Sequence, residues 1–313
     1  MKKTVLLSGF LAISFIFFGC PQVTMLGQID KETKLEEAVI KGLVGSVVYF
    51  QNNLYACDGN IYVKKADAVR GWSKVDALSG HIIKLAADAT NLYAMSVTTD
   101  NANKTTKQLH TTTDGKTWKL VTLASGEEIS TIFDTGSAFN ADSASGTNST
   151  AYIEIKNGET VSYKQLNGTS TPTTPTTPTP SDTPKSSIVS GDYYAINEGT
   201  KEKPQWVIKG AGDTTLIPVK GTIHSIALSP DKSTNTLYVA TNAGVKSYNV
   251  ADKTEKTLPG PNAPSMVKSS YNYFAVFAYE DAIYAAPALE GNVGSGVNGL
   301  FGYYESRGNW NVE

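Results

Sequence analysis

Residues 80–123 have the sequence GHIIKLAADATNLYAMSVTTDNANKTTKQLHTTTDGKTWKLVTL. Apolar and β-branched runs bounded by Gly, Asn and Asp indicate strands and tight turns. We predict four strands here, at residues 81–86, 91–97, 106–112 and 117–123, with Asp114-Gly115-Lys116 in the last turn. A single antiparallel unit of this kind cannot bury both of its faces, so it needs similar units as neighbours.

The pattern of the second strand, an aromatic residue among small apolar ones, recurs along the chain. The aromatic residues are Tyr55, Tyr93, Phe139, Tyr194, Tyr238 and Tyr284. Their interval of roughly 40 residues is typical of four-stranded propeller blades. We therefore predict an all-β fold, a β-propeller with six four-stranded blades. Seven blades and another all-β form are the alternatives, and residues 188–219 form the least regular repeat.

A Thr/Pro-rich segment interrupts the repeats between the third and fourth blades. The third blade is predicted to have its first strand at residues 129–133, Phe139 on its second strand, and its last two strands at 152–156 and 161–166. Residues 168–186 then contain five prolines and no large apolar side chain. Such a segment cannot offset its ordering entropy by packing, so we predict a disordered, extended insert. A stalk that presents or shields the propeller is the functional alternative.

The N-terminus has the features of a secretory signal. Two lysines precede an uncharged run over residues 5–18, which ends in Phe17-Phe18-Gly19-Cys20. The end of this run resembles a bacterial lipobox, and its looser form resembles those of spirochaete lipoproteins. The resemblance implies that residues 1–19 are removed and that Cys20 is acylated, with palmitate among the chains. A secreted protein with a buried cysteine is the alternative.

Lipidation at Cys20 would leave Cys57 as the one remaining cysteine, without an internal disulfide. Residues 20–44 are then a lipid-anchored tether and residues 45–313 the propeller. We expect a cell-envelope location, at the outer membrane, with the periplasmic or surface face left open. The membrane is a partner through the lipid. The formal net charge of −2 argues against nucleic acid as a partner, because nucleic-acid binding rests on an excess of Lys and Arg.

Residues 112–118 resemble the Asp-box of sialidases, with one residue fewer between Asp and Gly. The resemblance implies a structural turn. Asp114 would accept backbone N–H groups, Gly115 would adopt a positive φ, and Trp118 would be mostly buried between blades. Sialidase activity is disfavoured, because that family binds its substrate carboxylate with three arginines and this chain has only Arg70 and Arg307. Residues 226–245 resemble YVTN and lactonase-like propeller repeats, which again implies the fold.

The histidines supply the remaining candidate site. His81 and His224 occupy the same repeat position and are candidates for the mouth of the central channel. Two ligands fall short of the three or four that a metal site uses, so we predict no metal, and the motifs indicate no cofactor or catalytic residue. The expected function is a non-enzymatic binding or interaction module for an unidentified protein or glycan. A surface adhesin for host matrix protein or glycan, and a periplasmic enzyme with its site at the channel mouth, are the alternatives.

Replacing Cys20 with alanine tests the lipid anchor. Cys20→Ala should abolish labelling with a radioactive or clickable fatty acid, because an acylatable thiol at this position is the reason for the prediction. The variant should also move from the detergent phase to the aqueous phase, or remain uncleaved. Unchanged detergent partitioning of Cys20→Ala would contradict the anchor.

Overall fold

The computed structural model describes residues 38–136, 149–158, 160–174, 184–210, 212–230, 235–258, 272–288, 299–304 and 309–313. Residues 38–313 form one compact unit. The predicted signal peptide, Cys20 and most of the predicted tether lie outside the described residues, as does Phe139. No helix among the described residues is long and apolar enough to cross a membrane.

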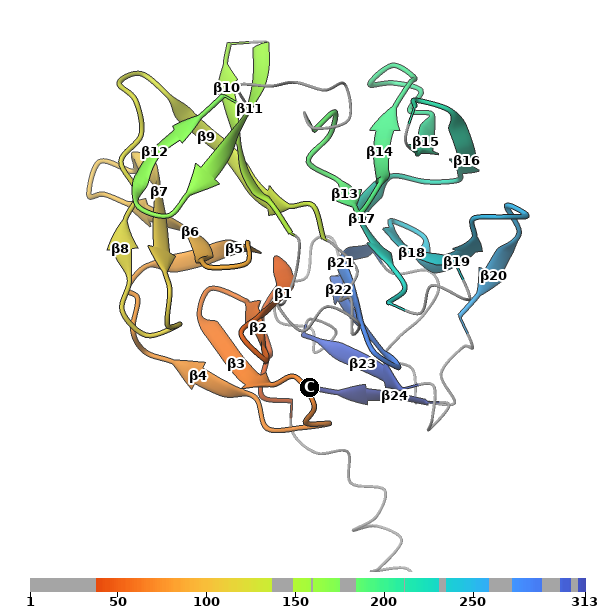
Figure 1. Cartoon of the computed structure of the whole chain (residues 1–313), viewed down its shortest axis with the longest axis horizontal. Helices are drawn as coiled ribbons and strands as arrows, with labels where there is room; N and C mark the ends of the chain where they lie inside the picture. Colours follow the sequence, from red (N-terminus) through yellow and green to blue (C-terminus); the bar gives the residue numbers. More distant parts are fainter. Residues whose placement is uncertain are drawn as a thin grey trace, which may run out of the picture. The chain divides into compact units, whose positions relative to one another are not determined.

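Six four-stranded antiparallel sheets follow one another around a ring, which confirms the predicted six-bladed propeller (Figure 1). The first three blades are β1 (Ser46–Phe50), β2 (Asn53–Cys57), β3 (Ile61–Lys65) and β4 (Ser73–Val75); β5 (His81–Ala87), β6 (Leu92–Thr99), β7 (Thr105–Thr112) and β8 (Lys119–Leu120); and β9 (Glu128–Asp134), β10 (Ala151–Asn157), β11 (Thr160–Asn167) and β12 (Ser170–Thr173). The last three are β13 (Val189–Ser190), β14 (Tyr193–Asn197), β15 (Trp206–Lys209) and β16 (Thr215–Val219); β17 (Ile223–Leu228), β18 (Thr236–Thr241), β19 (Gly244–Asn249) and β20 (Glu255–Thr257); and β21 (Asn272–Tyr279), β22 (Ala282–Ala288), β23 (Phe301–Tyr304) and β24 (Asn309–Val312).

The hydrophobic core lies between the blades rather than inside any one of them. Each buried cluster contains residues of two neighbouring blades; for example, Val48 and Tyr55 of blade 1 pack with Leu85 and Leu92 of blade 2. The residues of β1 are all buried, because this strand faces a neighbour on either side. Burial of apolar surface is the main favourable term in folding, so each blade depends on the next for its stability.

The third blade differs from the sequence prediction. Its second strand is β10, so the aromatic residue at the repeat position is Tyr152 and not Phe139. Tyr152 stacks on Phe133 of β9 with a centroid distance of 5.7 Å. The error arose because the connection from β9 to β10 is long, whereas the prediction assumed a short turn. The strands predicted at residues 152–156 and 161–166 are therefore the second and third strands of the blade, and not the third and fourth.

The fourth strand of this blade, β12, lies inside the segment that was predicted to be a disordered insert at residues 168–186. It pairs with β11 through Gln165↔Thr173 and Asn167↔Ser170. Pro172 is buried on this strand. A proline is tolerated at the outer edge of a sheet, because the N–H group that it lacks would face away from the ladder. Residues 175–183 of the segment lie outside the described residues.

The propeller also begins earlier than residue 45. Ile40 and Val44, which the sequence assigned to the tether, are fully buried in the cluster shared by the first and last blades. The backbone N–H groups of Val39 and Ile40 donate to the carbonyl of Glu313 at 3.0 and 3.2 Å. The chain before β1 therefore joins the last blade to the first.

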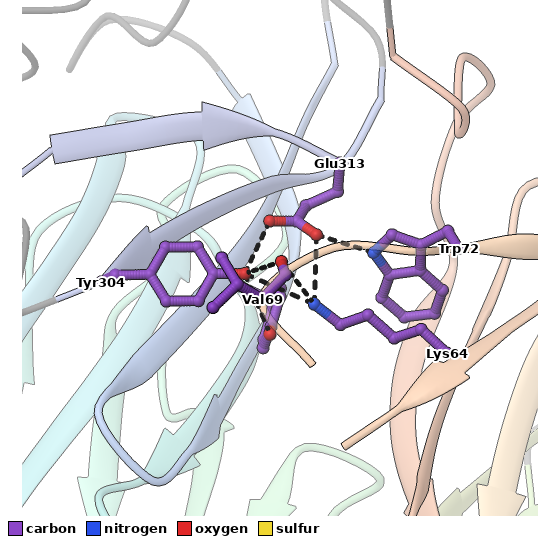
Figure 2. Close-up of polar contacts among 6 residues, drawn as sticks. Lys64, Val69, Trp72, Tyr304 and Glu313 are labelled. Carbon is purple, nitrogen blue, oxygen red and sulfur yellow. Dashed lines mark hydrogen bonds and ion pairs between the residues drawn. The ribbon is translucent and has the colours of Figure 1, made fainter. Parts of the chain in front are cut away.

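A buried polar cluster closes the ring at the same place (Figure 2). Lys64 of β3 and Glu313, which follows β24, form an ion pair of 3.2 Å, and their side chains are 0% and 1% exposed. The Trp72 indole donates to Glu313 Oε2 and the Tyr304 hydroxyl to Glu313 Oε1, each at 2.8 Å. Lys64 Nζ also lies 4.7 Å from the ring centroid of Tyr284. Burial lowers the pKa of Lys64, whereas the charge of Glu313 raises it.

Removing one charge of this pair should open the ring. Lys64→Met keeps the carbon stem but leaves the Glu313 carboxylate buried without its cation, so the free energy of unfolding should fall by about 3–5 kcal/mol. Denaturant unfolding measures this. The double variant Lys64→Met/Glu313→Gln should recover part of the loss, because no uncompensated charge remains. Lys74→Met is the control, because its pair with Asp76 is exposed and should contribute below about 1 kcal/mol. Equal effects of Lys64→Met and Lys74→Met would contradict this account.

Candidate functional site

The first strands of all six blades surround a central cavity of about 100 Å³. β1, β5, β9, β13, β17 and β21 lie next to the centre of the ring (Figure 1). The polar side chains that line the cavity are Ser46, Lys84, Asp134, Ser187, Ser190, His224 and Ser225. A concave site with convergent polar groups is the usual place to look for a ligand or a reaction.

Several of these side chains bridge neighbouring blades. Ser46 Oγ accepts the N–H of Leu85 at 2.7 Å, which joins blade 1 to blade 2. Ser190 Oγ accepts the N–H of Leu228 at 2.9 Å and donates to the carbonyl of Gly136 at 3.0 Å, which joins blade 4 to blades 5 and 3. These hydroxyls satisfy backbone groups that a sheet ladder cannot reach across a blade boundary.

Lys84 and Asp134 carry the charges of the cavity. Lys84 Nζ donates to the carbonyl of Gly45 at 2.9 Å, and burial lowers its pKa. The Asp134 carboxylate accepts the N–H of Ala87 at 3.0 Å and that of Gly136 at 2.9 Å. Burial raises the pKa of Asp134 to about 6, although these two hydrogen bonds and the charge of Lys84 favour the ionised form. Both side chains border the cavity, but protein atoms surround them and exclude the water that would stabilise their charges. This desolvation is the cause of both pKa shifts.

The structure does not bring the two candidate histidines together in the cavity. His224 lines it, with its ring 4.9 Å from that of Phe274 between centroids. His81 is exposed at the start of β5 and is not among the lining residues. The described residues contain no group of three His, Cys, Asp or Glu side chains placed to hold a metal ion.

The turn at Asp114 is built as a side-chain cap. Asp114 Oδ1 accepts the N–H groups of Lys116 and Thr117 at 2.8 and 2.7 Å, and these bonds hold its pKa well below the usual range. Gly115 has φ +69°, and a Cβ there would lie 2.3 Å from the hydroxyl oxygen of Tyr55. The turn therefore docks on blade 1 through a contact that a larger residue would break.

Trp118 is only half-buried, whereas the sequence predicted that it would be mostly buried. It packs at the edge of the cluster shared by blades 1 and 2. The outer strand that follows, β8, has two residues, and Leu120 on it is 57% exposed. An outer strand this short leaves the rim of the blade uncovered, so one side of the indole stays accessible.

The model of the TP013X lipoprotein family matches residues 2–201, which is more than half of the chain.

The chain belongs to the TP013X lipoprotein family.

Solved structures share the fold of this lipoprotein. The tricorn protease is 10% identical with a TM-score of 0.55, and the match covers 88% of this chain and 26% of that one. A glucose dehydrogenase is 9% identical with a TM-score of 0.49, and covers 82% of this chain and 96% of that one. The lipoprotein thus spans about a quarter of the tricorn protease chain, and at this identity the likeness concerns the fold alone. No curated protein matches the chain in sequence.

Sequence reasoning missed the polar residues that bridge the blades of this lipoprotein. Ser46, Lys84 and Ser190 lie on inner strands, and Asp134 ends one of them. A polar residue in an otherwise apolar inner strand was the only available signal. It did not reveal the partner, because each partner belongs to another blade.

The raised pKa of Asp134 predicts a pH-dependent stability. A carboxyl whose pKa is higher in the folded state stabilises the fold when protonated, and this contribution is lost as the pH rises through about 6. The Asp134→Asn variant does not titrate there, so its free energy of unfolding should fall less than that of the wild type between about pH 4 and pH 6. Asp76→Asn, at an exposed carboxylate, is the control and should keep the wild-type slope. Parallel curves for Asp134→Asn and the wild type would refute the burial of this charge.

Proposed function

We propose that this lipoprotein is a lipid-anchored envelope protein whose propeller is a non-enzymatic binding module. The observation that carries the proposal is that polar side chains of the central cavity hydrogen-bond to the backbone of neighbouring blades. Ser46, Asp134 and Ser190 each hold an inner strand of a neighbouring blade. Groups committed to backbone hydrogen bonds are poorly placed to transfer protons or to attack a substrate, so the centre of the ring serves the scaffold.

The anchor and the scaffold together support a role in binding. Gly19-Cys20 after an apolar run supports acylation of Cys20, and we place the protein at the outer membrane. Two or three acyl chains hold a protein firmly to a bilayer. A ring of six blades presents its connecting turns to the outside on a rigid support, and binding residues are common on such turns.

An enzyme with its site in the central cavity is the second candidate. One observation favours it: the pKa of Asp134 is about 6, close to the value that suits a general acid or base, and Lys84 lies in the same cavity. Perturbed carboxyls also occur in purely structural networks, and the two N–H groups on Asp134 fit that description.

Photo-cross-linking in living cells separates these candidates. A photoreactive amino acid at exposed positions, such as Leu120, Val161 and Lys201, should give discrete high-mass adducts at some positions and none at others. The Cys20→Ala variant should lose those adducts that form only when the lipid anchor holds the protein at the membrane. The Asp134→Asn variant should keep them, because Asp134 lies at the centre of the ring. Absence of adducts at every exposed position would contradict the binding module, and loss of all adducts in Asp134→Asn would favour the central cavity.

A further inference from the structure

A second, larger cavity lies away from the centre of the ring, between blades 2 and 3. Its volume is about 410 Å³, within the range of small-ligand pockets. Three segments line it: residues 88–91 in the β5–β6 turn, residues 149–150 before β10, and residues 165–168 at the end of β11. We refer to it as the interblade cleft. The sequence singled out none of these residues.

A single side chain, that of Tyr93, links the two walls of the interblade cleft. The Tyr93 hydroxyl donates to Asp88 Oδ2 at 2.8 Å and accepts the N–H of Gly168, also at 2.8 Å. Tyr93 is fully buried on β6, and burial raises its pKa. One phenol thus fixes the turn of blade 2 against the turn of blade 3. A cleft with fixed walls binds a ligand without the entropic cost of ordering them.

Gly168 sets the distance between the walls. Its φ is +59°, and a Cβ at this position would lie 3.3 Å from Asn91 Oδ1, which is a tight contact. The amide of Asn91 is held in turn, because its Nδ2 donates to Asp88 Oδ1 at 3.2 Å and to Thr90 Oγ1 at 2.7 Å. The Asn91 amide therefore stands in one orientation at the junction of the blades.

The lining chemistry indicates the kind of ligand. Among the described residues, it consists of hydroxyls, amides, one carboxylate and the apolar side chains of Ala89 and Leu166, without a Lys, Arg or His. The carboxylate is Asp88, and its Oδ1 already accepts the N–H groups of Thr90 and Asn91. A lining without cations disfavours sulfate, phosphate and acidic sugars, because an anion would meet only the negative charge of Asp88. The lining therefore favours a neutral ligand that carries both hydrogen-bond donors and acceptors.

One of the lining hydroxyls lacks an internal partner. Ser149 Oγ is buried and has no hydrogen-bond partner in the structure. Most buried polar atoms in proteins are paired, so an unpaired one calls for an explanation. Rotation of the Ser149 side chain about χ1 toward the cleft would let Oγ pair with a ligand hydroxyl, which would relieve the desolvation cost of the unpaired group. The half-buried amide of Gln165 borders the same cleft.

We propose that the interblade cleft binds a neutral saccharide, whose hydroxyls pair with Ser149, Gln165 and the side-chain oxygen of Asn91. A pyranose offers several hydroxyls that act both as donors and as acceptors, which matches a lining of amides and hydroxyls. This inference rests on the proposed binding function and names the class of its ligand and the place where it binds.

The test uses the full-length lipoprotein in a detergent without a sugar headgroup. An array of neutral, sialylated and sulfated oligosaccharides is probed first, and the neutral hits are titrated by calorimetry. We expect binding to neutral oligosaccharides, weakened about tenfold by Gln165→Ala and by Ser149→Ala. Gln108→Ala and Ser162→Ala are the matched controls, because these residues are exposed on β7 and β11 and neither lines the cleft. The controls should bind as the wild type does.

Thermal melting curves test whether a loss of affinity arises from misfolding of the variant. Ser149→Ala removes a buried hydroxyl without a partner, so its melting temperature should equal or exceed that of the wild type while its affinity falls. Absence of array binding, a preference for sialylated or sulfated oligosaccharides, or unchanged affinity in both cleft variants would overturn the proposal. Cross-linked adducts in cells together with no saccharide binding would leave the binding module standing and remove only this ligand class.

Discussion

The buried ion pair between Lys64 and Glu313 is the interaction on which the ring depends. Each blade consists of four consecutive strands, so no strand of the last blade completes the sheet of the first. Side chains must hold that junction instead. Lys64 and Glu313 do so with Trp72 and Tyr304, and residues 39–40 add two backbone hydrogen bonds to Glu313. A buried charge is stable only when an opposite charge and hydrogen bonds compensate it. Removal of either Lys64 or Glu313 should therefore destabilise this junction.

Polar side chains bridge the other junctions, and buried apolar clusters of the described residues pack at four of them. Ser46, Asp134 and Ser190 each accept a backbone N–H from the inner strand of a neighbouring blade. These bridges fill the small central cavity with groups that already have partners. The same feature that stabilises the ring therefore directs any larger ligand away from its centre.

The junction between blades 2 and 3 provides the space for the proposed binding site. Between blades 2 and 3, the Tyr93 hydroxyl bonds to Asp88 and to Gly168, and the segments around these two residues line the interblade cleft. The cleft exists because Tyr93 of one blade reaches Gly168 of the next, where a side chain at Gly168 would crowd Asn91. Binding sites at the junction of rigid units are common, since their walls are fixed by the packing of the units.

The sequence alone determined the fold class, the six blades and the strand character of most repeats, because these follow from local periodicity and turn residues. The capping role of Asp114 was predictable for the same reason, since the carboxylate accepts its hydrogen bonds from residues of the same turn. Only the tertiary structure decided that Tyr152 takes the third repeat position, that Ile40 belongs to the core, and that His81 and His224 do not meet. Lys64 and Glu313 are 249 residues apart, and pairs at such separation leave no periodic trace in one chain. Their contact arises when the ring closes, so the residues that hold this propeller together and those that line its cleft became visible only once the blades were packed.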